Sequence, residues 1–163
     1  MKTIPVVTYK WNDPAVKEVD NRKEQQEELL TASDAIRVLI ADDFAIIRAG
    51  LAAAINHEPD MHVCASARDG NEAVEMYRKH LPDVTVMDLR MPNMDGAAAT
   101  ETIRAEFPHA CILVLSISDE KAGIFRALSA GATAYLLKDA PRAEIIAMIR
   151  ELHHSRKKPL FFK

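Results

Sequence analysis

The sequence is poor in cysteine, glycine and tryptophan, and it holds no long apolar run. Its 163 residues include two cysteines, five glycines and one tryptophan. Cys64 and Cys111 stand far apart with no CxxC pattern, so we expect neither a disulfide framework nor a zinc site. No stretch approaches the roughly 18 apolar residues that cross a bilayer, and no signal-peptide core follows Met1. These absences predict a soluble, cytoplasmic protein that makes no membrane contact.

An excess of charge of one sign is also missing. Lys and Arg number 21 against 24 for Asp and Glu, and the formal net charge is −3 at pH 7. This balance gives no broad attraction to nucleic acid, so DNA binding would need an output domain that is absent from this chain. The length suits one domain with an added tail and is too short for several catalytic domains.

The composition divides the chain into three parts. Residues 1–35 lack a sustained hydrophobic period, which predicts a polar N-terminal extension, disordered or part-helical. Residues 36–153 alternate aliphatic runs with segments of helical period and form the predicted domain. Residues 154–163 carry the basic Arg156–Lys158 and the apolar Leu160–Phe162, as in a basic and apolar tail or a linker stub. Two interpretations of Arg156–Lys158 stay open: weak contact with a phosphate backbone, or the solvated end of the last predicted helix.

Five short runs of β-branched and aliphatic residues predict five strands. They are Ile36–Ala41, Met61–Ser66, Val84–Met87, Cys111–Leu115 and Ala134–Leu137. Five helices are expected after them, each with apolar residues on one face. These residues are Ile47, Leu51, Ala54 and Ile55; Ala73, Val74, Tyr77 and Leu81; Ala99, Ile103 and Phe107; Ala122, Phe125 and Leu128; and Ile145, Ile146, Ile149 and Leu152. The pattern predicts an α/β fold, a doubly wound five-stranded parallel sheet with helices on both faces.

Polar side chains follow four of the five predicted strands. Asp42 and Asp43 come directly after the first strand, Asp88 after the third, Ser116 after the fourth and Lys138 after the fifth. In such a sheet these positions share the carboxyl edge, where ligands bind. Two carboxylates about 4 Å apart repel by roughly 4 kcal/mol at an effective dielectric near 20, so three need a compensating charge. Oxygen ligands favour Mg²⁺; taken singly, the aspartates could instead be helix caps or turn residues.

The motifs at these positions resemble those of a response-regulator receiver domain. The resemblance rests on Asp42–Asp43, Met87–Gly96, Ser116 and Gly131–Asp139. The stretch Phe44–Leu51, which contains Arg48-Ala49-Gly50-Leu51, and the ending Tyr135–Asp139 are similar to the NarL/FixJ branch in particular. The resemblance covers about residues 36–152 and implies the flavodoxin-like strand order 2-1-3-4-5.

The resemblance implies a phosphorelay protein of a two-component system. Asp88 would accept a phosphoryl group from the phosphohistidine of a histidine kinase, with its carboxylate as the nucleophile. Mg²⁺ would be held by Asp43, Asp88 and the backbone carbonyl of Arg90, with Asp42 acting through a bound water. Lys138 would neutralise charge on the transferring oxygens, and a structural ion pair with the acidic cluster is its alternative role.

The same resemblance implies a conformational switch. The Ser116 hydroxyl would donate to the phosphoryl group, and Tyr135 would turn inward; an ordinary half-buried tyrosine is the alternative. Arg90 and Ser118 flank the path of water to the acyl phosphate, and we hypothesise that they set the dephosphorylation rate. In the loop after the third strand, Gly96 is expected to permit a positive φ and so to shape the turn.

The predicted partner is a histidine kinase, and a homodimer is a further expectation. It would form through the fourth helix, fifth strand and fifth helix, or through the first and fifth helices.

Enzyme activity is expected only as Mg²⁺-dependent self-phosphorylation from a donor and as autodephosphorylation. One alternative is a NarL-type transcription regulator whose helix-turn-helix lies outside this chain. Another is an aspartyl-phosphate phosphatase, which is disfavoured because Arg90 stands where a second aspartate would be expected.

Overall fold

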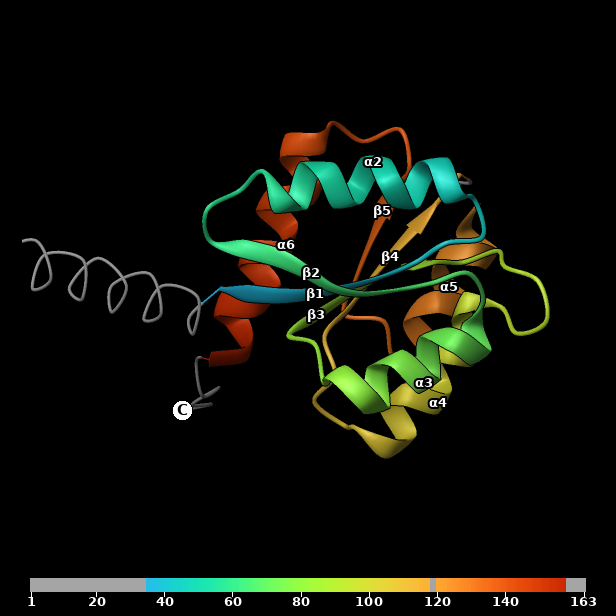
Figure 1. The fold of residues 1–163 in the computed structure, drawn as a ribbon. Coiled ribbons are helices and arrows are strands. Elements are labelled where there is room, and N and C mark those ends of the chain that lie inside the picture. The colour runs from blue at the N-terminus through green and yellow to red at the C-terminus, as the bar shows by residue number, and fades with distance from the viewer. Residues whose placement is uncertain (1–34, 118–119, 158–163) are drawn as a thin grey trace, which may run out of the picture. The chain divides into compact units, whose positions relative to one another are not determined.

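The computed structural model describes residues 35–117 and 120–157, so residues 1–34 of the predicted extension and the residues after Lys157 lie outside the described part of the chain. Figure 1 shows strands and helices in alternation. The elements are β1 (Ile36–Ala41), α2 (Ala45–Asn56), β2 (Met61–Ala67), α3 (Gly70–His80), β3 (Val84–Asp88), α4 (Gly96–Glu106), β4 (Ile112–Ser116), α5 (Lys121–Ser129), β5 (Ala134–Leu137) and α6 (Arg142–Lys157).

The five strands form one parallel sheet in the order β2-β1-β3-β4-β5. This confirms the predicted doubly wound fold and its flavodoxin-like strand order. The crossovers place α2 and α6 on one face of the sheet and α3, α4 and α5 on the other (Figure 1). All connections from a strand to its following helix therefore leave the same edge of the sheet.

Alternate side chains of each central strand enter different cores. Leu39 and Met87 pack toward α3 and α4, whereas Val38 and Val86 pack toward α2 and α6. All four are at most 2% exposed, which explains why these strands read as continuous apolar runs rather than as an alternation of polar and apolar residues. Helices cover both faces of the sheet, so we expect the functional residues at the ends of the strands.

The apolar face predicted for the last helix, α6, is confirmed. Ile145, Ile146, Ile149 and Leu152 are all buried and pack against the core on the α2 side. The helix begins directly after Pro141, whose carbonyl accepts the N–H groups of Glu144 and Ile145. It continues to Lys157, past the boundary predicted between residues 153 and 154.

The predicted inward face of α5 is wrong. Phe125 and Leu128 are 73% and 49% exposed, and the buried residue of this helix is Ala127. A helix of nine residues has only about two and a half turns, so its apolar pattern does not decide which side meets the sheet. The small Ala127 side chain lets α5 approach the core, and the larger side chains face outward.

No helix among residues 35–117 and 120–157 has the length and apolar character needed to cross a membrane.

Candidate functional site

Five polar residues named from the sequence meet at the carboxyl edge of the sheet. Asp42 and Asp43 follow β1, Asp88 ends β3, Ser116 ends β4 and Lys138 follows β5. The strand pairing brings them together, because β3 lies between β1 and β4, and β4 pairs with β5. The Lys138 N–H donates to the Ser116 carbonyl at 2.7 Å and so fixes the end of β5 beside the end of β4.

Three carboxylates form the centre of the site. Asp42, Asp43 and Asp88 each offer one oxygen, and these oxygens lie within 4.8 Å of one another. Asp42 and Asp88 are only 2% and 5% exposed. The Lys138 ammonium lies 2.7 Å from Asp42 Oδ2 and 2.9 Å from Asp88 Oδ2. Among the described residues, this ammonium pairs with two of the three carboxylates, so the negative charge of the cluster exceeds the positive charge that contacts it.

Burial and pairing act in opposite directions on the ionisable groups of the site. Burial raises the pKa of Asp88 above its ordinary value, and the hydrogen bond and charge of Lys138 offset this only in part. For Lys138, burial works against the ammonium form, but hydrogen bonds to Asp42 and Asp88 outweigh it and raise the pKa. Lys138 thus stays a cation, and an ionised Asp88 is under electrostatic strain that a further cation would relieve.

The donor set fits a hard divalent cation. Asp43 Oδ1 is buried and accepts no hydrogen bond among the described residues. An unpaired buried carboxylate oxygen is costly unless a charge or a donor satisfies it. Since the cluster offers carboxylate oxygens, it matches Mg²⁺ or Ca²⁺ better than metals that prefer nitrogen and sulfur.

The loop after Asp88 is held against the site by its backbone. The Gly96 N–H donates to the Leu89 carbonyl at 3.0 Å, and the Arg90 N–H reaches Asp88 Oδ1 at 3.3 Å. A Cβ on Gly96 would stand 1.9 Å from the Asp88 carbonyl oxygen. The expected positive φ at Gly96 is wrong: among the described residues only Leu81, Asn93 and Gly131 have one. Gly96 is needed for close backbone approach, and Asn93 supplies the left-handed turn.

The other predicted residues lie around this centre. Tyr135 in β5 is half-buried and packs against the core on the α3 side, with its hydroxyl near Gly123. The Arg90 side chain is exposed, whereas Ser118 lies outside the described residues.

Sequence reasoning missed two contacts near the site. In the sequence, Arg48 stands out only as part of a motif, yet its guanidinium donates to the carbonyls of both Asp42 and Asp43. Asn93 donates to Asp69 Oδ2 at 2.9 Å and so ties the loop after β3 to the start of α3. The tolerance of asparagine for positive φ is a sequence signal for the Asn93 contact. No pattern in the sequence predicts the Arg48 contact.

The fold and the acidic cluster at the carboxyl edge of the sheet can be compared with those of known proteins. A family model for the response regulator receiver domain matches residues 38–150, and the chain belongs to this family. The oxygen regulatory protein NreC of Staphylococcus haemolyticus is 39% identical over 119 residues, which are 72% of this chain and 55% of that protein. NreC of Staphylococcus carnosus is equally similar, with the same coverage. The chain thus spans about half the length of the curated relatives it matches.

Solved structures agree with the NarL-type branch. The signal receiver domain of the putative response regulator NarL from Mycobacterium tuberculosis is 37% identical with a TM-score of 0.71, covering 74% of this chain and 98% of that one. A two-component response regulator of the LuxR family from Aurantimonas sp. is 34% identical with a TM-score of 0.71, covering 75% and 87%. The chain is a receiver domain of the NarL type.

Proposed function

We propose that the chain accepts a phosphoryl group on Asp88 from the phosphohistidine of a histidine kinase. The observation that carries this proposal is the arrangement around Asp88: a buried carboxylate, paired with Lys138, at the carboxyl edge of a receiver-family sheet. In the transfer, the bond between phosphorus and the imidazole nitrogen breaks and a bond to an Asp88 carboxylate oxygen forms. The electron pair stays on the imidazole nitrogen, and the product is an acyl phosphate.

Each site residue has a distinct task in this proposal. Asp43, Asp88 and the backbone carbonyl of Arg90 would hold Mg²⁺, with Asp42 acting through a water; the proposal is supported by the three aspartate oxygens, which lie within 4.8 Å of one another. When bound, Mg²⁺ supplies the positive charge that the three carboxylates and the incoming phosphoryl oxygens require. Lys138 already pairs with Asp88 at rest, so its ammonium is in place to neutralise an oxygen of the arriving group. The structural and the catalytic role of Lys138 are therefore compatible.

The proposed switch runs from Ser116 to Tyr135. Ser116 ends β4 and pairs in register with Leu137 of β5, two residues beyond Tyr135. A charge-assisted hydrogen bond from the Ser116 hydroxyl to a phosphoryl oxygen is worth roughly 1.5 to 3 kcal/mol. A full population shift needs about 5.5 kcal/mol, so Lys138 and the metal must contribute as well. We propose that Arg90 and Ser118 then set the lifetime of the acyl phosphate.

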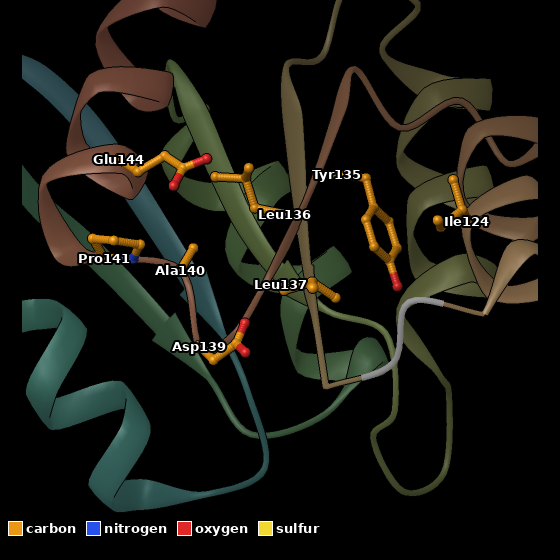
Figure 2. A pocket seen from close by; sticks show the side chains of 8 residues that line it. All are labelled: Ile124, Tyr135, Leu136, Leu137, Asp139, Ala140, Pro141 and Glu144. Atoms are coloured by element: carbon orange, nitrogen blue, oxygen red, sulfur yellow. The ribbon is translucent and has the colours of Figure 1, made fainter.

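A cavity on the α5, β5 and α6 side supports an output role for this face. Figure 2 shows Tyr135 and Ile124 at one end of it, and Glu144 and Pro141 at the other. Its volume is about 480 Å³. A change at Tyr135 alters the wall of this cavity, so we propose that phosphorylation changes homodimerisation here. The groove between α2 and α6 is the second surface that the sequence predicts, with a volume of about 430 Å³.

The proposed setting is a cytoplasmic two-component system that regulates transcription. The relatives named above are about twice as long as the matched region, so the receiver forms only part of them. We propose that DNA is contacted only through an output domain and that this chain supplies the phosphorylation signal. Its own charge gives no broad attraction to nucleic acid.

The test separates a receiver from a phosphatase. The protein is incubated with Mg²⁺ and either acetyl phosphate or a chromogenic phosphate ester, and bound phosphate and released alcohol are both quantified. We expect labelling that stops near one phosphate per chain with acetyl phosphate and no sustained ester turnover. Many turnovers of the ester at wild-type Asp88, lost in Asp88→Asn, would favour the phosphatase and contradict the proposal.

A further inference from the structure

The connection between β1 and α2, visible in Figure 1, carries two of the three carboxylates. One nitrogen of Arg48, Nη1, donates to the Asp42 carbonyl at 2.6 Å and to the Asp43 carbonyl at 3.2 Å. Arg48 stands on α2, so its side chain folds back over the first turn of the helix to reach the loop. Two consecutive peptide groups of the loop are thereby attached to a single planar group.

The usual devices that hold a helix start are missing from α2. Its N-cap position is Phe44, which makes no side-chain capping bond, and its first turn holds no acidic residue. In contrast, α3 and α4 begin with capping aspartates, Asp69 and Asp95. The contacts that hold the loop before α2 include those of Arg48, the bond from the Phe44 N–H to an Asp42 carboxylate oxygen, and the bond from the Asp42 N–H to the Ala67 carbonyl at the end of β2.

The Arg48 contacts act on Asp43 in particular. The carbonyls of Asp42 and Asp43 belong to the two peptide planes that flank the Asp43 Cα, so holding both fixes φ and ψ of Asp43. These two angles set the direction of its Cβ. The Asp43 side chain has no anchor of its own at Oδ1, which is buried and accepts no hydrogen bond in the described residues. Its aim into the cluster therefore depends on the backbone that Arg48 holds.

We propose that Arg48 is a positioning residue for the divalent-cation site: it presets the Asp43 carboxylate and so sets the affinity of the acidic cluster for the cation. The inference rests on the proposed Mg²⁺ function of that cluster. It assigns Arg48 no contact with the phosphoryl group. Preorganisation of this kind lowers the cost of ordering a ligand on binding and leaves the chemistry of transfer unchanged.

The competing explanation is that Arg48 only stabilises the start of α2. Arg104 offers a matched control, because its Nη1 also donates to a carbonyl six residues away, that of Ala110, at 3.1 Å. Ala110 precedes β4 and so stands at the opposite edge of the sheet from the aspartates. Arg104→Met removes an arginine-to-backbone anchor of the same kind, away from the acidic cluster.

The test measures Mg²⁺ binding to the unphosphorylated full chain by titration calorimetry, with the free energy of unfolding measured in urea. We expect Arg48→Met to raise the Mg²⁺ Kd about tenfold, which is about 1.4 kcal/mol, and Arg104→Met to change it less than twofold. Arg48→Lys keeps the charge without the planar fork and should fall between them. With Mg²⁺ well above both Kd values, labelling of Arg48→Met by acetyl phosphate should return to within about twofold of wild type.

A wild-type Kd in Arg48→Met, with loss of stability like that of Arg104→Met, would overturn the inference and leave Arg48 as a helix-start stabiliser. If Arg48→Met does not fold, Arg48→Lys decides in the same way: a wild-type Kd overturns the inference. A wild-type protein that binds no Mg²⁺ would contradict the proposed function itself. The two failures are therefore distinguishable by the wild-type titration alone.

Discussion

Asp88 carries its negative charge in an environment that disfavours it. Its side chain is buried, two other carboxylates are close, and Lys138 is shared with Asp42. Burial raises the pKa of Asp88, so at neutral pH its ionised form costs free energy in the folded protein relative to the unfolded chain. Asp88 is thus a buried nucleophile at the carboxyl edge of the sheet, and an added positive charge would stabilise its ionised form.

Replacement of Asp88 by asparagine should therefore stabilise the metal-free protein. We expect Asp88→Asn to raise the free energy of unfolding at pH 7 by roughly 1 kcal/mol, because the strained charge is removed while Lys138 keeps its contact with Asp42. Urea unfolding in the presence of a chelator measures this change. Since the pKa is raised in the fold, the advantage should shrink as the pH falls through that pKa toward the ordinary value of 3.8.

Asp95→Asn is the matched control of opposite sign. Burial opposes the Asp95 charge, but hydrogen bonds from the Ala98 N–H and the Arg126 guanidinium outweigh it and lower the pKa. The same chemical change should therefore destabilise the protein at pH 7, by roughly 1 kcal/mol. Equal effects of the two substitutions would contradict the electrostatic account of the site.

The sequence was sufficient to locate the strand-end residues but not their supports. Asp42, Asp88 and Lys138 could be placed because every strand of a doubly wound sheet ends at one edge. The role of Arg48 could not, since its contact joins a side chain to backbone carbonyls and leaves no spacing signal. The sequence predicts that Gly96 lies beside the site but not why a glycine is needed there, because close backbone approach depends on three-dimensional packing.

At the scale of elements, the start of α4 is pressed against the end of β3. We expect Gly96→Ala to destabilise the fold by at least about 2 kcal/mol, because its Cβ would overlap the Asp88 carbonyl. Gly50→Ala, in the interior of α2, meets nothing within 4 Å and should stabilise by roughly 0.5 to 1 kcal/mol. Thermal and urea unfolding of both variants test this contrast. Similar effects at the two glycines would contradict the described packing.

A second element-scale contact ties α6 to the turn before β2. Arg150 pairs with Asp60 through two nitrogens and also with Glu58. The hydrogen bond from Arg150 outweighs partial burial and lowers the pKa of Asp60 below 3.8. The stabilisation is thus present above pH 3.8 and is lost as the pH falls through the lowered value.

Arg150→Met should accordingly cost about 0.5 to 1 kcal/mol at pH 7, since solvent screens these partly exposed groups. The difference from wild type should narrow when unfolding is measured at successively lower pH below 3.8. A difference that stays constant or grows toward low pH would show that the loss comes from packing of the arginine stem and not from the ion pairs.

The helices also show where sequence patterns stop being decisive. The long α6 places four apolar residues inward as its spacing predicts. The short α5 does not, and it leaves Phe125 and Leu128 on the surface. The spacing of apolar residues shows which of them share one face of a helix. Which face packs against the sheet depends on the neighbours that α5 contacts.

At the scale of the whole molecule, phosphorylation should change association. We expect acetyl phosphate with Mg²⁺ to shift the protein toward a dimer in size-exclusion chromatography with light scattering. Ile124→Glu places a charge in the wall of the cavity beside Tyr135 and should abolish the shift. Ala53→Glu, in the groove between α2 and α6, should leave it intact. The reverse pattern would assign the dimer to the α2 and α6 surface.

The most direct measurement locates the modified residue. The full chain is treated with acetyl phosphate and Mg²⁺, the acyl phosphate is trapped by borohydride reduction, and the peptides are mapped by mass spectrometry. We predict one modified residue, Asp88, with no modification when Mg²⁺ is withheld or in Asp88→Asn. A folded protein that stays unmodified, or that is modified at another carboxylate, would contradict the account.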